Sequence, residues 1–383
     1  MTERLRIAVI GAGAMGQGHC SSIGRVPELR LTAVCDTHEE TVRAVGSRFG
    51  VPAFTDVDAL LAAGCADAAL VAVPHPLHAA ITLPCLAAGW HVLCEKPLAD
   101  TVGAADAMLA AARARGVAFA VMFQRRFDGM MRAAIEFARG GGIGRVIRTE
   151  LVVQEFRAQW YFDSNPWRAT WRGEGGGVLL NQAAHLLDIF ALVGGLPASL
   201  YGRAETRLHD IEVEDTAEAL LRYPDGGSGY IHCSTVEPPD GGGLEVVGER
   251  GAVRYRGGRL RILRYPAGVG AFARVADEVW AKPPVEDISA GEVNEAPRQS
   301  LVLENFARHI LRGEPLWCDA ASALASLELA NAITLSGALG REVALPVDRA
   351  AYDALLAERR ANSTYRKREM AAARVTDPKL VAG

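Results

Sequence analysis

Residues 5–16 of the chain read LRIAVIGAGAMG, an apolar run that ends in a glycine-rich turn. The β-branched run Arg6–Ile10 predicts a buried strand, and the residues after the turn predict a helix. In this setting Gly11 allows a tight turn, Gly13 lets the backbone approach a pyrophosphate, and Gly16 allows the helix to pack closely on the strand. The stretch predicts a dinucleotide site at the start of a parallel α/β sheet. A glycine-rich turn without a ligand is the alternative.

A bound dinucleotide would lie on the first turn of that helix. The free N–H groups there, including those of Ala14 and Met15, and the positive end of the helix dipole favour phosphates. Asp36 lies 20 residues after Gly16, at the end of the second predicted strand, where its carboxylate can bind the ribose hydroxyls and repel a 2′-phosphate. Since Thr37 follows rather than an arginine, we expect NAD as the cofactor in preference to NADP.

The first part of the chain alternates strands and helices. Ala-rich segments at Leu77–Ala88 and Ala104–Arg115 predict two of the helices. The alternation predicts βαβ units, and hence a Rossmann parallel sheet in an NAD-binding domain over residues 1–124. The five predicted strands are Arg6–Ile10, Leu31–Cys35, Ala68–Val73, His91–Cys94 and Val117–Phe123.

After residue 124 the pattern changes to hairpins. Pro224–Gly227 is a turn signal between two strands, and two long helices are predicted late in the chain, at Ser300–Arg312 and Ala320–Leu339. We expect an α+β domain over residues 125–346, with an open, mostly antiparallel sheet and helices on one face, that binds substrate and forms subunit contacts. Its predicted strands are Arg145–Val153, Ala217–Tyr223, Ser228–Thr235, Leu244–Val247, Ala252–Arg256 and Leu260–Tyr265.

Three other segments complete the predicted domain organisation. Gly241–Gly243 and Pro266–Val293 are predicted to be loops. Residues 347–383 form a C-terminal tail whose stretch Ala350–Arg374 predicts a helix. We expect this tail to pack on the body of the protein or on a neighbouring subunit.

The composition excludes several classes of protein. The chain has 383 residues, 50% hydrophobic and 22% charged, which predicts a soluble globular protein of two or three domains. A net charge of −4 argues against a nucleic-acid partner. We find no run of about 18 apolar residues and no apolar leader, so we expect no membrane span and a cytoplasmic location. Seven widely spaced cysteines without a CxxC pattern argue against disulfides and a metal site.

Two strand ends carry polar residues where parallel sheets place their ligands. Val73, Pro74 and His78 follow the third predicted strand, and we take them as cofactor contacts, although a histidine here can also cap a helix. Glu95 and Lys96 follow the fourth strand, and the next residue is a proline that allows a cis bond. A lysine there would lie beside the nicotinamide and polarise a hydroxyl or carbonyl group. A plain turn is the alternative.

Tryptophans are concentrated between residues 154 and 172. Trp160, Trp167 and Trp171 fall within 12 residues. Their faces can stack on the C–H faces of a sugar ring, while burial in a core or an interface is the alternative.

A helix is predicted to follow the glycine-rich break 173–177, from about Val178. It would place Asn181 and His185, four residues apart, on one face, with Asp188 one turn further. His185 suits a general base that removes a hydroxyl proton, and Asn181 can orient a hydroxyl group. A purely structural histidine is the alternative.

Taken in order, these features make the chain resemble the Gfo/Idh/MocA family of oxidoreductases. The resemblance covers residues 5–345, and the Glu95–Pro97 tripeptide with the GGGxLxxxxxH stretch carries most of its specificity. It implies a Rossmann domain and an open-sheet domain that assembles into a homodimer or homotetramer. It also implies hydride transfer between NAD(P) and a sugar, polyol or cyclitol.

The resemblance further implies residue roles. Lys96 would be the lysine at the nicotinamide and His185 the acid/base, both touching substrate beside Trp160, Trp167 and Asn181. Glu95 and Pro74 would line the cofactor, Trp167 and Arg168 would match a family Trp-Arg pair, and Gln124 would contact the cofactor. With the residues above, the predicted cofactor contacts are Gly11, Gly13, Ala14, Met15, Asp36, Val73, Pro74, His78, Glu95, Lys96, Gln124, Trp167 and Arg168.

The chain departs from the family pattern at one position. Many inositol and sugar dehydrogenases of the family have an aspartate four residues before the histidine, where this chain has Asn181. The aromatic segment with Asn181 is more similar to the branch that oxidises pyranosides and anhydrosugars such as levoglucosan, often at C3. We therefore expect NAD-dependent oxidation of a secondary sugar hydroxyl.

Three other functions fit the same features. They are an inositol or cyclitol dehydrogenase, a glycosidase or epimerase that recycles tightly bound NAD, and a non-catalytic sugar sensor. A sensor would not need to keep both Lys96 and His185.

Overall fold

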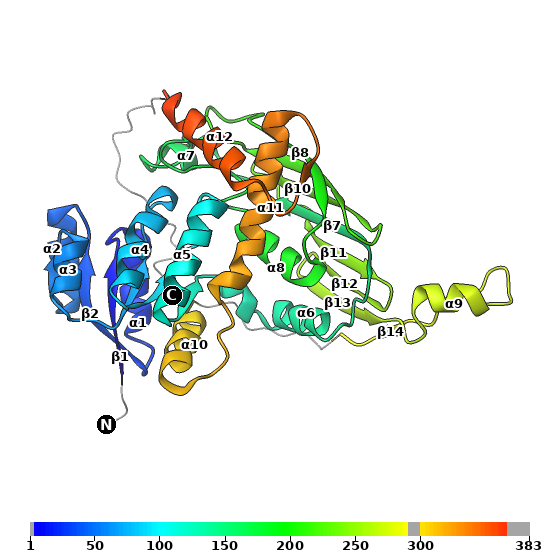
Figure 1. The fold of residues 1–383 in the computed structure, drawn as a ribbon, viewed down its shortest axis with the longest axis horizontal. Coiled ribbons are helices and arrows are strands. Elements are labelled where there is room, and N and C mark those ends of the chain that lie inside the picture. The colour runs from blue at the N-terminus through cyan, green and yellow to red at the C-terminus, as the bar shows by residue number, and fades with distance from the viewer. Residues whose placement is uncertain (1–3, 290–298, 366–383) are drawn as a thin grey trace.

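The computed structural model describes residues 4–289 and 299–365. Its first sheet is parallel, with strand order β3-β2-β1-β4-β5-β6, as the sequence predicts for a Rossmann domain (Figure 1). All five predicted strands are present, and β3 is a short strand that the sequence did not reveal. The strands are β1 Leu5–Ile10, β2 Leu29–Cys35, β3 Ala53–Phe54, β4 Ala68–Val71, β5 His91–Cys94 and β6 Phe119–Val121.

Helices surround this sheet and bury it. Every residue of β4 is fully buried, which explains why its sequence is uniformly apolar. Thr101 caps the helix α5, where its side chain accepts a hydrogen bond from the N–H of Ala104. The helices are α1 Ala14–Ile23, α2 Glu39–Phe49, α3 Val57–Ala62, α4 His78–Ala87 and α5 Val102–Arg115, with short 3₁₀ turns η1 His75–Leu77 and η2 Gln124–Phe127.

The second sheet has nine strands in the order β14-β13-β12-β11-β7-β10-β9-β8-β15. Its neighbouring strands are antiparallel except β7 and β10, which run parallel, so the predicted mostly antiparallel sheet is confirmed. The strands are β7 Val146–Gln154, β8 Ser199–Glu205, β9 Thr216–Arg222, β10 Ser228–Ser234, β11 Gly243–Gly248, β12 Gly251–Arg256, β13 Arg259–Arg264, β14 Glu286–Asp287 and β15 Val343–Ala344.

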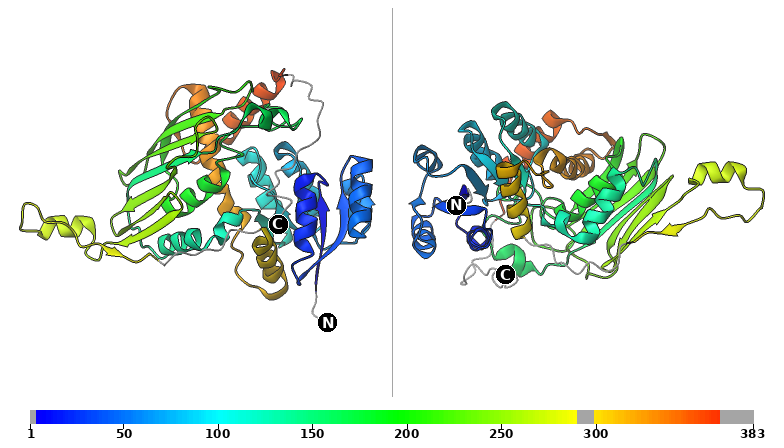
Figure 2. Two further views of the ribbon diagram at one scale, coloured as in Figure 1. Left: turned by 180° about the vertical axis from the view of Figure 1, so that it is seen from behind. Right: turned by 90° about the horizontal axis from the view of Figure 1, so that it is seen from below.

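One face of the second sheet is covered by helices and the other is open. The helices α6 Gly129–Arg139, α8 Ala184–Gly194 and α11 Ala320–Leu339 lie on the face turned toward the first sheet (Figure 2). On the open face, Tyr201, Leu220 and Tyr230 are cross-strand neighbours with side chains between 36% and 63% exposed. An apolar patch of this kind fits the subunit contact that the sequence led us to expect.

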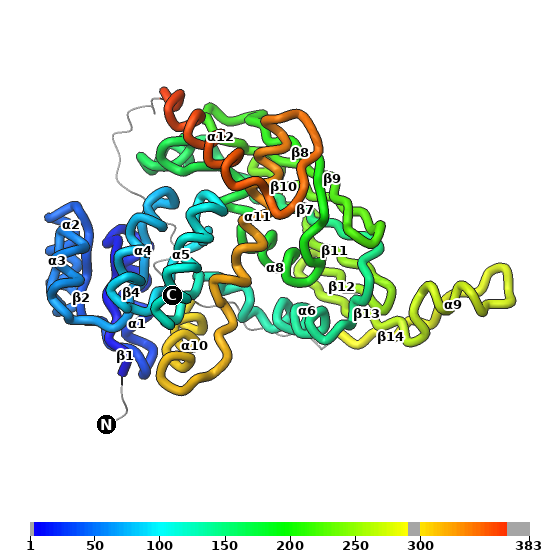
Figure 3. The backbone as a smooth tube through the Cα atoms, viewed as in Figure 1, coloured from blue at the N-terminus to red at the C-terminus, as the bar shows by residue number. Residues whose placement is uncertain are grey.

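The chain returns to the first domain after residue 299 (Figure 3). The helix α10 Gln299–Arg312 packs on α1, and its Arg308 and Arg312 both pair with the buried Glu28. The helix α11 packs on α5 as well as on β8. The late helices therefore join the two sheets, rather than belonging to the second sheet alone.

The long helix α11 has the length and apolar composition of a membrane span, although the sequence analysis found none. In the structure 67% of its apolar window is buried within the protein. Its contacts with α5, α8 and β8 make it a central packing helix.

The C-terminal tail begins as predicted, with a helix on the body of the protein. The helix α12 Arg349–Ala361 packs on α5 and α11, and Arg349 pairs with Asp106 and with the buried Glu328. Helix α12 ends earlier than the predicted Ala350–Arg374, and residues 366–374 lie outside the described part of the chain.

The prediction of a loop over Pro266–Val293 is wrong for part of that segment. It contains the helix α9 Val269–Val275 and the edge strand β14, and it projects from the sheet as an arm (Figure 1). Trp280 on this arm is 88% exposed and no residue of α9 is buried, so the segment lacks the apolar periodicity that reveals a helix. Residues 290–293 lie outside the described part of the chain.

A buried ion pair joins η2 to α8. The Arg126 guanidinium donates to both carboxylate oxygens of Asp188 at 2.6 and 2.7 Å, and both side chains are at most 1% exposed. Arg126 also donates to the Trp317 carbonyl and the Ser322 hydroxyl beside α11. One side chain therefore connects three segments around the end of strand β6.

We expect Arg126→Met to lower the free energy of unfolding by about 3–5 kcal/mol, because it leaves the Asp188 carboxylate buried without a partner. The measurement is denaturant unfolding followed by circular dichroism. The double variant R126M/D188L, which removes both charges, should be less destabilised than R126M. A loss below about 1 kcal/mol in R126M would contradict this role.

Candidate active site

The glycine-rich turn is built so that only one of its three glycines faces open space. Gly11 has φ +101°, and a Cβ there would lie 2.3 Å from the Ala72 carbonyl oxygen. A Cβ at Gly16 would lie 1.8 Å from the Gly11 carbonyl oxygen. A Cβ at Gly13 would meet no atom within 4 Å. The fold itself therefore needs Gly11 and Gly16, while the space above Gly13 fits a pyrophosphate group.

The first turn of α1 is free to bind an anion. Gly13 is its N-cap and offers no side-chain cap, and the first turn has no acidic residue. Both predicted contacts Ala14 and Met15 lie in this turn. Its backbone N–H groups and the helix dipole fit the phosphates of a dinucleotide.

Asp36 follows directly after β2 and lies beside the glycine turn. Its Oδ2 accepts a hydrogen bond from the Ala12 N–H at 2.7 Å, and its Oδ1 accepts one from the His38 N–H at 2.9 Å. A carboxylate oxygen can accept a second hydrogen bond, so both oxygens can still bind ribose hydroxyls. The geometry fits the predicted role of Asp36 at the adenosine ribose.

His78 holds two strand-end loops together. Its Nδ1 lies 2.8 Å from the Pro97 carbonyl oxygen, and its Nε2 lies 3.0 Å from the Val73 carbonyl oxygen. Burial lowers the pKa of this histidine. The sequence predicts a cofactor contact for His78, whereas in this structure both of its ring nitrogens face protein carbonyls, those of Val73 and Pro97.

Glu95 is buried against a histidine that the sequence did not single out. His19 Nε2 lies 2.7 Å from Glu95 Oε1, and the Lys96 N–H donates to Glu95 Oε2 at 3.1 Å. Burial opposes ionisation, but the contact with His19 and the charge of Lys96 prevail and lower the pKa of Glu95. His19 follows Gly16 by three residues on α1, a spacing that could have indicated a side chain near the sheet.

The Lys96 ammonium reaches across to the second domain. Its Nζ donates to the Asn181 carbonyl oxygen at 2.9 Å and to Asn181 Oδ1 at 3.0 Å. An ammonium has three N–H donors, so one remains for a substrate oxygen. Burial lowers the pKa of Lys96, and the negative charge of Glu95 partly offsets this effect. The Lys96–Pro97 peptide bond is cis.

The prediction that Asn181 and His185 share a helix face is wrong. Helix α8 begins at Ala184, and residues 178–183 form turns. The Asn181 carbonyl accepts a hydrogen bond from Lys96, and the Val178 N–H donates one to the Glu214 carbonyl. These backbone groups therefore bond to other segments of the chain rather than within a helix. The turns nevertheless bring Asn181 and His185 to one cavity.

This cavity has a volume of about 180 Å³ and lies between the two domains. Burial, with the nearby charges of Lys96 and Arg125, lowers the pKa of His185 to about 3, so the imidazole is neutral at neutral pH. Its Nδ1 is buried and has no hydrogen-bond partner within the described residues. A neutral imidazole can accept a proton. The cavity is lined by Lys96, Arg125, Glu155, Arg157, Tyr161, Asn181, Gln182, His185 and Leu186.

The predicted tryptophans lie outside this lining. Trp160 is 45% exposed on the short helix α7 Gln159–Asp163, and Trp167 packs edge-on against His75 with ring centroids 5.0 Å apart. Trp171 is partly buried against the core and lies under the Arg359 guanidinium. Trp160 and Trp171 are therefore not among the residues that line this cavity, and Trp167 lies beside His75.

Two further predicted residues have unsatisfied polar atoms. Gln124 Oε1 and Arg168 Nε are buried without a hydrogen-bond partner in the part of the chain that the structure describes. The Arg168 guanidinium lies 4.0 Å from the centre of the Tyr161 ring. Buried polar groups normally have partners, so such atoms fit groups supplied by a bound cofactor and substrate.

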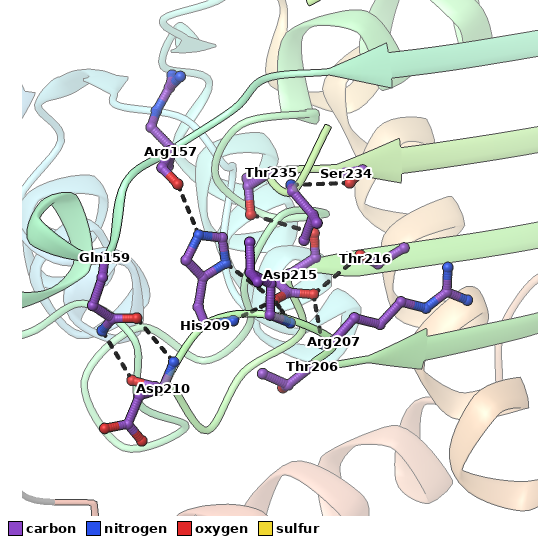
Figure 4. Close-up of polar contacts among 12 residues, drawn as sticks. Arg157, Gln159, Thr206, Arg207, His209, Asp210, Asp215, Thr216, Ser234 and Thr235 are labelled. Atoms are coloured by element: carbon purple, nitrogen blue, oxygen red, sulfur yellow. Dashed lines mark hydrogen bonds and ion pairs between the residues drawn. The ribbon is translucent and has the colours of Figure 1, made fainter. Parts of the chain in front are cut away.

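A buried His–Asp pair anchors the loop that supplies Arg157 and Tyr161 (Figure 4). His209 Nε2 lies 2.7 Å from the Arg157 carbonyl oxygen, and its Nδ1 lies 3.0 Å from Asp215 Oδ2. Burial would raise the pKa of Asp215, but hydrogen bonds from the N–H groups of residues 207–209 and from the His209 side chain keep it lowered. The anchor lies on the second sheet and fixes one wall of the cavity.

The sequence missed several of the lining residues. They come from the turn η2, from the segment between β7 and the end of the short helix α7, and from the turn before α8 and the start of α8 itself. Only the RR pair after β6 gave a signal, since it follows a strand end. The missed residues are Arg125, Glu155, Arg157, Tyr161, Gln182 and Leu186.

Comparisons with known proteins agree with this geometry. Residues 5–123 match the family model described as oxidoreductase family, NAD-binding Rossmann fold, and residues 131–254 match that of the GFO/IDH/MocA C-terminal domain. Inositol 2-dehydrogenase from Rubrobacter xylanophilus is 30% identical over 348 residues, which cover 88% of this chain and 91% of the relative.

Two solved structures have the same fold. The WlbA dehydrogenase from Bordetella pertussis, in complex with NADH and UDP-GlcNAcA, has a TM-score of 0.74 and 28% identity over 90% of this chain and 100% of that one. Levoglucosan dehydrogenase in complex with NADH also has a TM-score of 0.74, over 90% and 100% of the two chains, at 19% identity. At 19% identity, the comparison with levoglucosan dehydrogenase shows similarity of fold alone.

The chain belongs to the Gfo/Idh/MocA family of NAD-dependent oxidoreductases. The resemblance seen in the sequence is thereby confirmed, as are the enzyme class and NAD as the cofactor.

We expect Gly13→Ala to keep the fold and to weaken NADH binding at least about tenfold, or about 1.4 kcal/mol. The added methyl group meets no protein atom but occupies the space where the pyrophosphate approaches the backbone. The measurement is a fluorescence titration with NADH. In the matched variant Gly16→Ala the methyl group strikes the Gly11 carbonyl, so thermal stability should fall. Equal NADH affinity of G13A and the wild type would contradict the assignment.

We expect Asp36→Ala to raise the Kd for NADH about 10–100-fold, the value of one hydrogen-bonded charge. The Kd for NADPH should change much less, because the carboxylate that repels its 2′-phosphate is gone. Both are measured by titration, with Asp348→Ala, which removes the cap of α12, as the control. Tighter binding of NADPH than NADH by the wild type would overturn this reading of Asp36.

Proposed function

We propose that this enzyme oxidises a secondary hydroxyl group on the pyranose ring of a sugar and transfers hydride to NAD⁺. The observation that carries the proposal is that Lys96 and His185, from different domains, line one cavity together with Asn181. This cavity lies beyond the carboxyl ends of the parallel strands, where such sheets bind their ligands.

Lys96 and His185 have complementary roles in this reaction. The free N–H of the Lys96 ammonium donates to the substrate hydroxyl oxygen and stabilises the negative charge that develops there. The neutral His185 imidazole accepts the hydroxyl proton. Bound NAD⁺ supplies the hydride acceptor. Proton transfer of this kind contributes about 10²–10⁴ in rate.

The character of the cavity supports a sugar. Its lining carries Lys96, Arg125 and Arg157 with hydroxyl and amide groups from Tyr161 and Gln182, which suits a ligand with many oxygen atoms. WlbA, at 28% identity, is in complex with a sugar nucleotide that has an acid group, UDP-GlcNAcA. We therefore include uronic acids and sugar nucleotides with free pyranosides and anhydrosugars. The proposed position of oxidation, C3, rests on the sequence resemblance to the branch that oxidises pyranosides and anhydrosugars.

An inositol or cyclitol is the second candidate substrate. The inositol 2-dehydrogenase relative, at 30% identity over most of both chains, favours it. A ring of secondary hydroxyls would present the same group to Lys96 and His185. The homo-oligomer and the cytoplasmic location remain predictions from the sequence.

We expect a panel of pyranosides, anhydrosugars, uronic acids and cyclitols to contain one class with which NADH accumulates in the presence of NAD⁺. Lys96→Met and His185→Asn should lower kcat about 10²–10⁴-fold and leave the Kd for NADH near the wild-type value. The measurement is the absorbance of reduced nicotinamide during turnover.

Two matched variants control for the loss of a lysine or a histidine elsewhere. Lys282→Met removes an exposed lysine on the arm, and His232→Asn removes a histidine of β10 that pairs with Glu237. Both should keep wild-type kcat. Wild-type turnover by K96M or H185N would refute the role given to that residue, and product formation without NADH accumulation would indicate an enzyme that recycles its cofactor.

A further inference from the structure

We propose that Glu174 is a positioning residue for Lys96. Its carboxylate fixes the Asn181 amide so that Oδ1 faces the ammonium, and it supplies the negative charge that position 181 lacks. This inference rests on the proposed function, since Lys96 is the group whose geometry and charge it sets.

The three side chains form a continuous buried chain of hydrogen bonds. Lys96 Nζ donates to Asn181 Oδ1 at 3.0 Å, and Asn181 Nδ2 donates to Glu174 Oε1 at 2.6 Å. Asn181 is 8% exposed and Glu174 is 1% exposed. A bond of 2.6 Å between an amide N–H and a carboxylate is short, as expected when the acceptor is charged.

The carboxylate decides which way the amide of Asn181 points. An asparagine side chain has one accepting end and one donating end. In the opposite orientation its oxygen would face the Glu174 carboxylate and its NH₂ group would face the Lys96 ammonium. Both contacts would then be repulsive, so Glu174 and Lys96 together select one orientation.

The loop around Glu174 is shaped to hold the carboxylate. Its second oxygen, Oε2, accepts a hydrogen bond from the Ala169 N–H at 2.7 Å. Ala169 has φ +68°, and among the residues that the structure describes it is the one non-glycine with a positive φ. A left-handed conformation is unfavourable for alanine, and such outliers gather at functional sites. The turn at Ala169 therefore adopts an unfavourable backbone conformation, and in it the Ala169 N–H points at the Glu174 carboxylate.

The charge of Glu174 is sensitive to pH near neutrality. Burial raises the pKa of Glu174 to about 7, opposed by the hydrogen bonds from Ala169 and Asn181. The other charged or titratable groups that act on it are Arg168, Glu214, Tyr161 and Lys96. Within the described residues, no cation lies within 4.0 Å of its carboxylate. Below about pH 7 the protonated form no longer supports the Lys96 charge.

Function and stability therefore depend on this residue in opposite directions. Because the pKa is raised in the folded protein, ionising Glu174 costs more in the folded state than in the unfolded chain. Its contribution to stability is thus lost as the pH rises from about 4.5 through about 7, while the ionised form is the one that positions Lys96. A variant without the charge should therefore lose less stability than the wild type as the pH rises from about 5 to 8, and should work less well.

Two variants separate the roles. In Glu174→Gln the amide oxygen can accept a hydrogen bond from the Ala169 N–H or from Asn181 Nδ2, but not from both. The amide NH₂ group then faces the other donor, and no carboxylate remains. The exchange E174Q/N181D restores a carboxylate and an amide in swapped places. The introduced glutamine then accepts from the Ala169 N–H and donates to the introduced aspartate, which accepts from Lys96.

Lys96 can be observed directly because the chain has four lysines, Lys96, Lys282, Lys367 and Lys379. Protein labelled with ¹³Cε-lysine gives few signals in a pH titration by NMR, and K96R identifies the signal of Lys96. We expect E174Q to lower the pKa of Lys96, to lower kcat at least tenfold with a smaller change in KM, and to remove the step near pH 7 from the pH profile of kcat. The exchange places a carboxylate in direct contact with the ammonium, so it should raise the lysine pKa to the wild-type value or above it and return most of kcat.

The matched control is Glu214→Gln. Glu214 is also a buried carboxylate with a raised pKa near the same loop, but its oxygen accepts from the Leu179 N–H rather than from Asn181. E214Q should leave the pKa of Lys96 nearly unchanged and keep the step in the pH profile of kcat, moved to lower pH because the charge of Glu214 raises the pKa of Glu174.

An unchanged lysine pKa in E174Q, or a failure of the exchange to restore it, would overturn the proposal. The titration needs no substrate, so its result is independent of turnover. If no sugar or cyclitol is oxidised by the wild type, the proposed function fails while the link from Glu174 to Lys96 is still measured. The Kd for NADH and the thermal midpoint show whether each variant is folded.

Discussion

The contact between the Lys96 ammonium and the two oxygens of Asn181 is the interaction on which the site depends. Lys96 ends a strand of the Rossmann sheet, and Asn181 belongs to the turns before α8 in the second domain. A buried cation needs fixed partners because it has left water. The two domains must therefore meet at this point for the lysine to stay charged, and the cavity forms beside it.

The surrounding polar groups follow from that requirement. Glu95 contacts Lys96 from the first domain and is itself held by His19, while Asn181 contacts Lys96 from the second domain and is held by Glu174. The negative charge of both carboxylates raises the pKa of Lys96, and burial lowers it. An amide between lysine and carboxylate keeps the two charges apart, which leaves the ammonium a stronger proton donor than a direct ion pair would.

How much the sequence revealed depended on whether a feature is local. Gly11, Gly16 and Asp36 are recognisable because each is tied to the backbone of one strand–turn–helix unit, and Gly13 is recognisable by its fixed place in the same turn. Lys96, which lines the cavity, was recognisable for the same reason, because it follows the end of strand β5. The predicted start of α8 was wrong because the Asn181 carbonyl accepts a hydrogen bond from Lys96, which is distant in the sequence, instead of one within a helix. Arg157 and Glu174 could not be found, since their positions depend on loops fixed by His209 and by Ala169.

The polar groups of the site also differ in whether they have hydrogen-bond partners before a ligand binds. The cofactor half offers backbone N–H groups at a helix end, which water can satisfy when no ligand is bound. Elsewhere in the site, Gln124 Oε1, Arg168 Nε and His185 Nδ1 are buried without a partner in the described chain. An unsatisfied buried polar group costs about 1–3 kcal/mol. Packing elsewhere, such as the Arg126–Asp188 pair, must hold these groups in place, so the ligand meets an arrangement that is already formed.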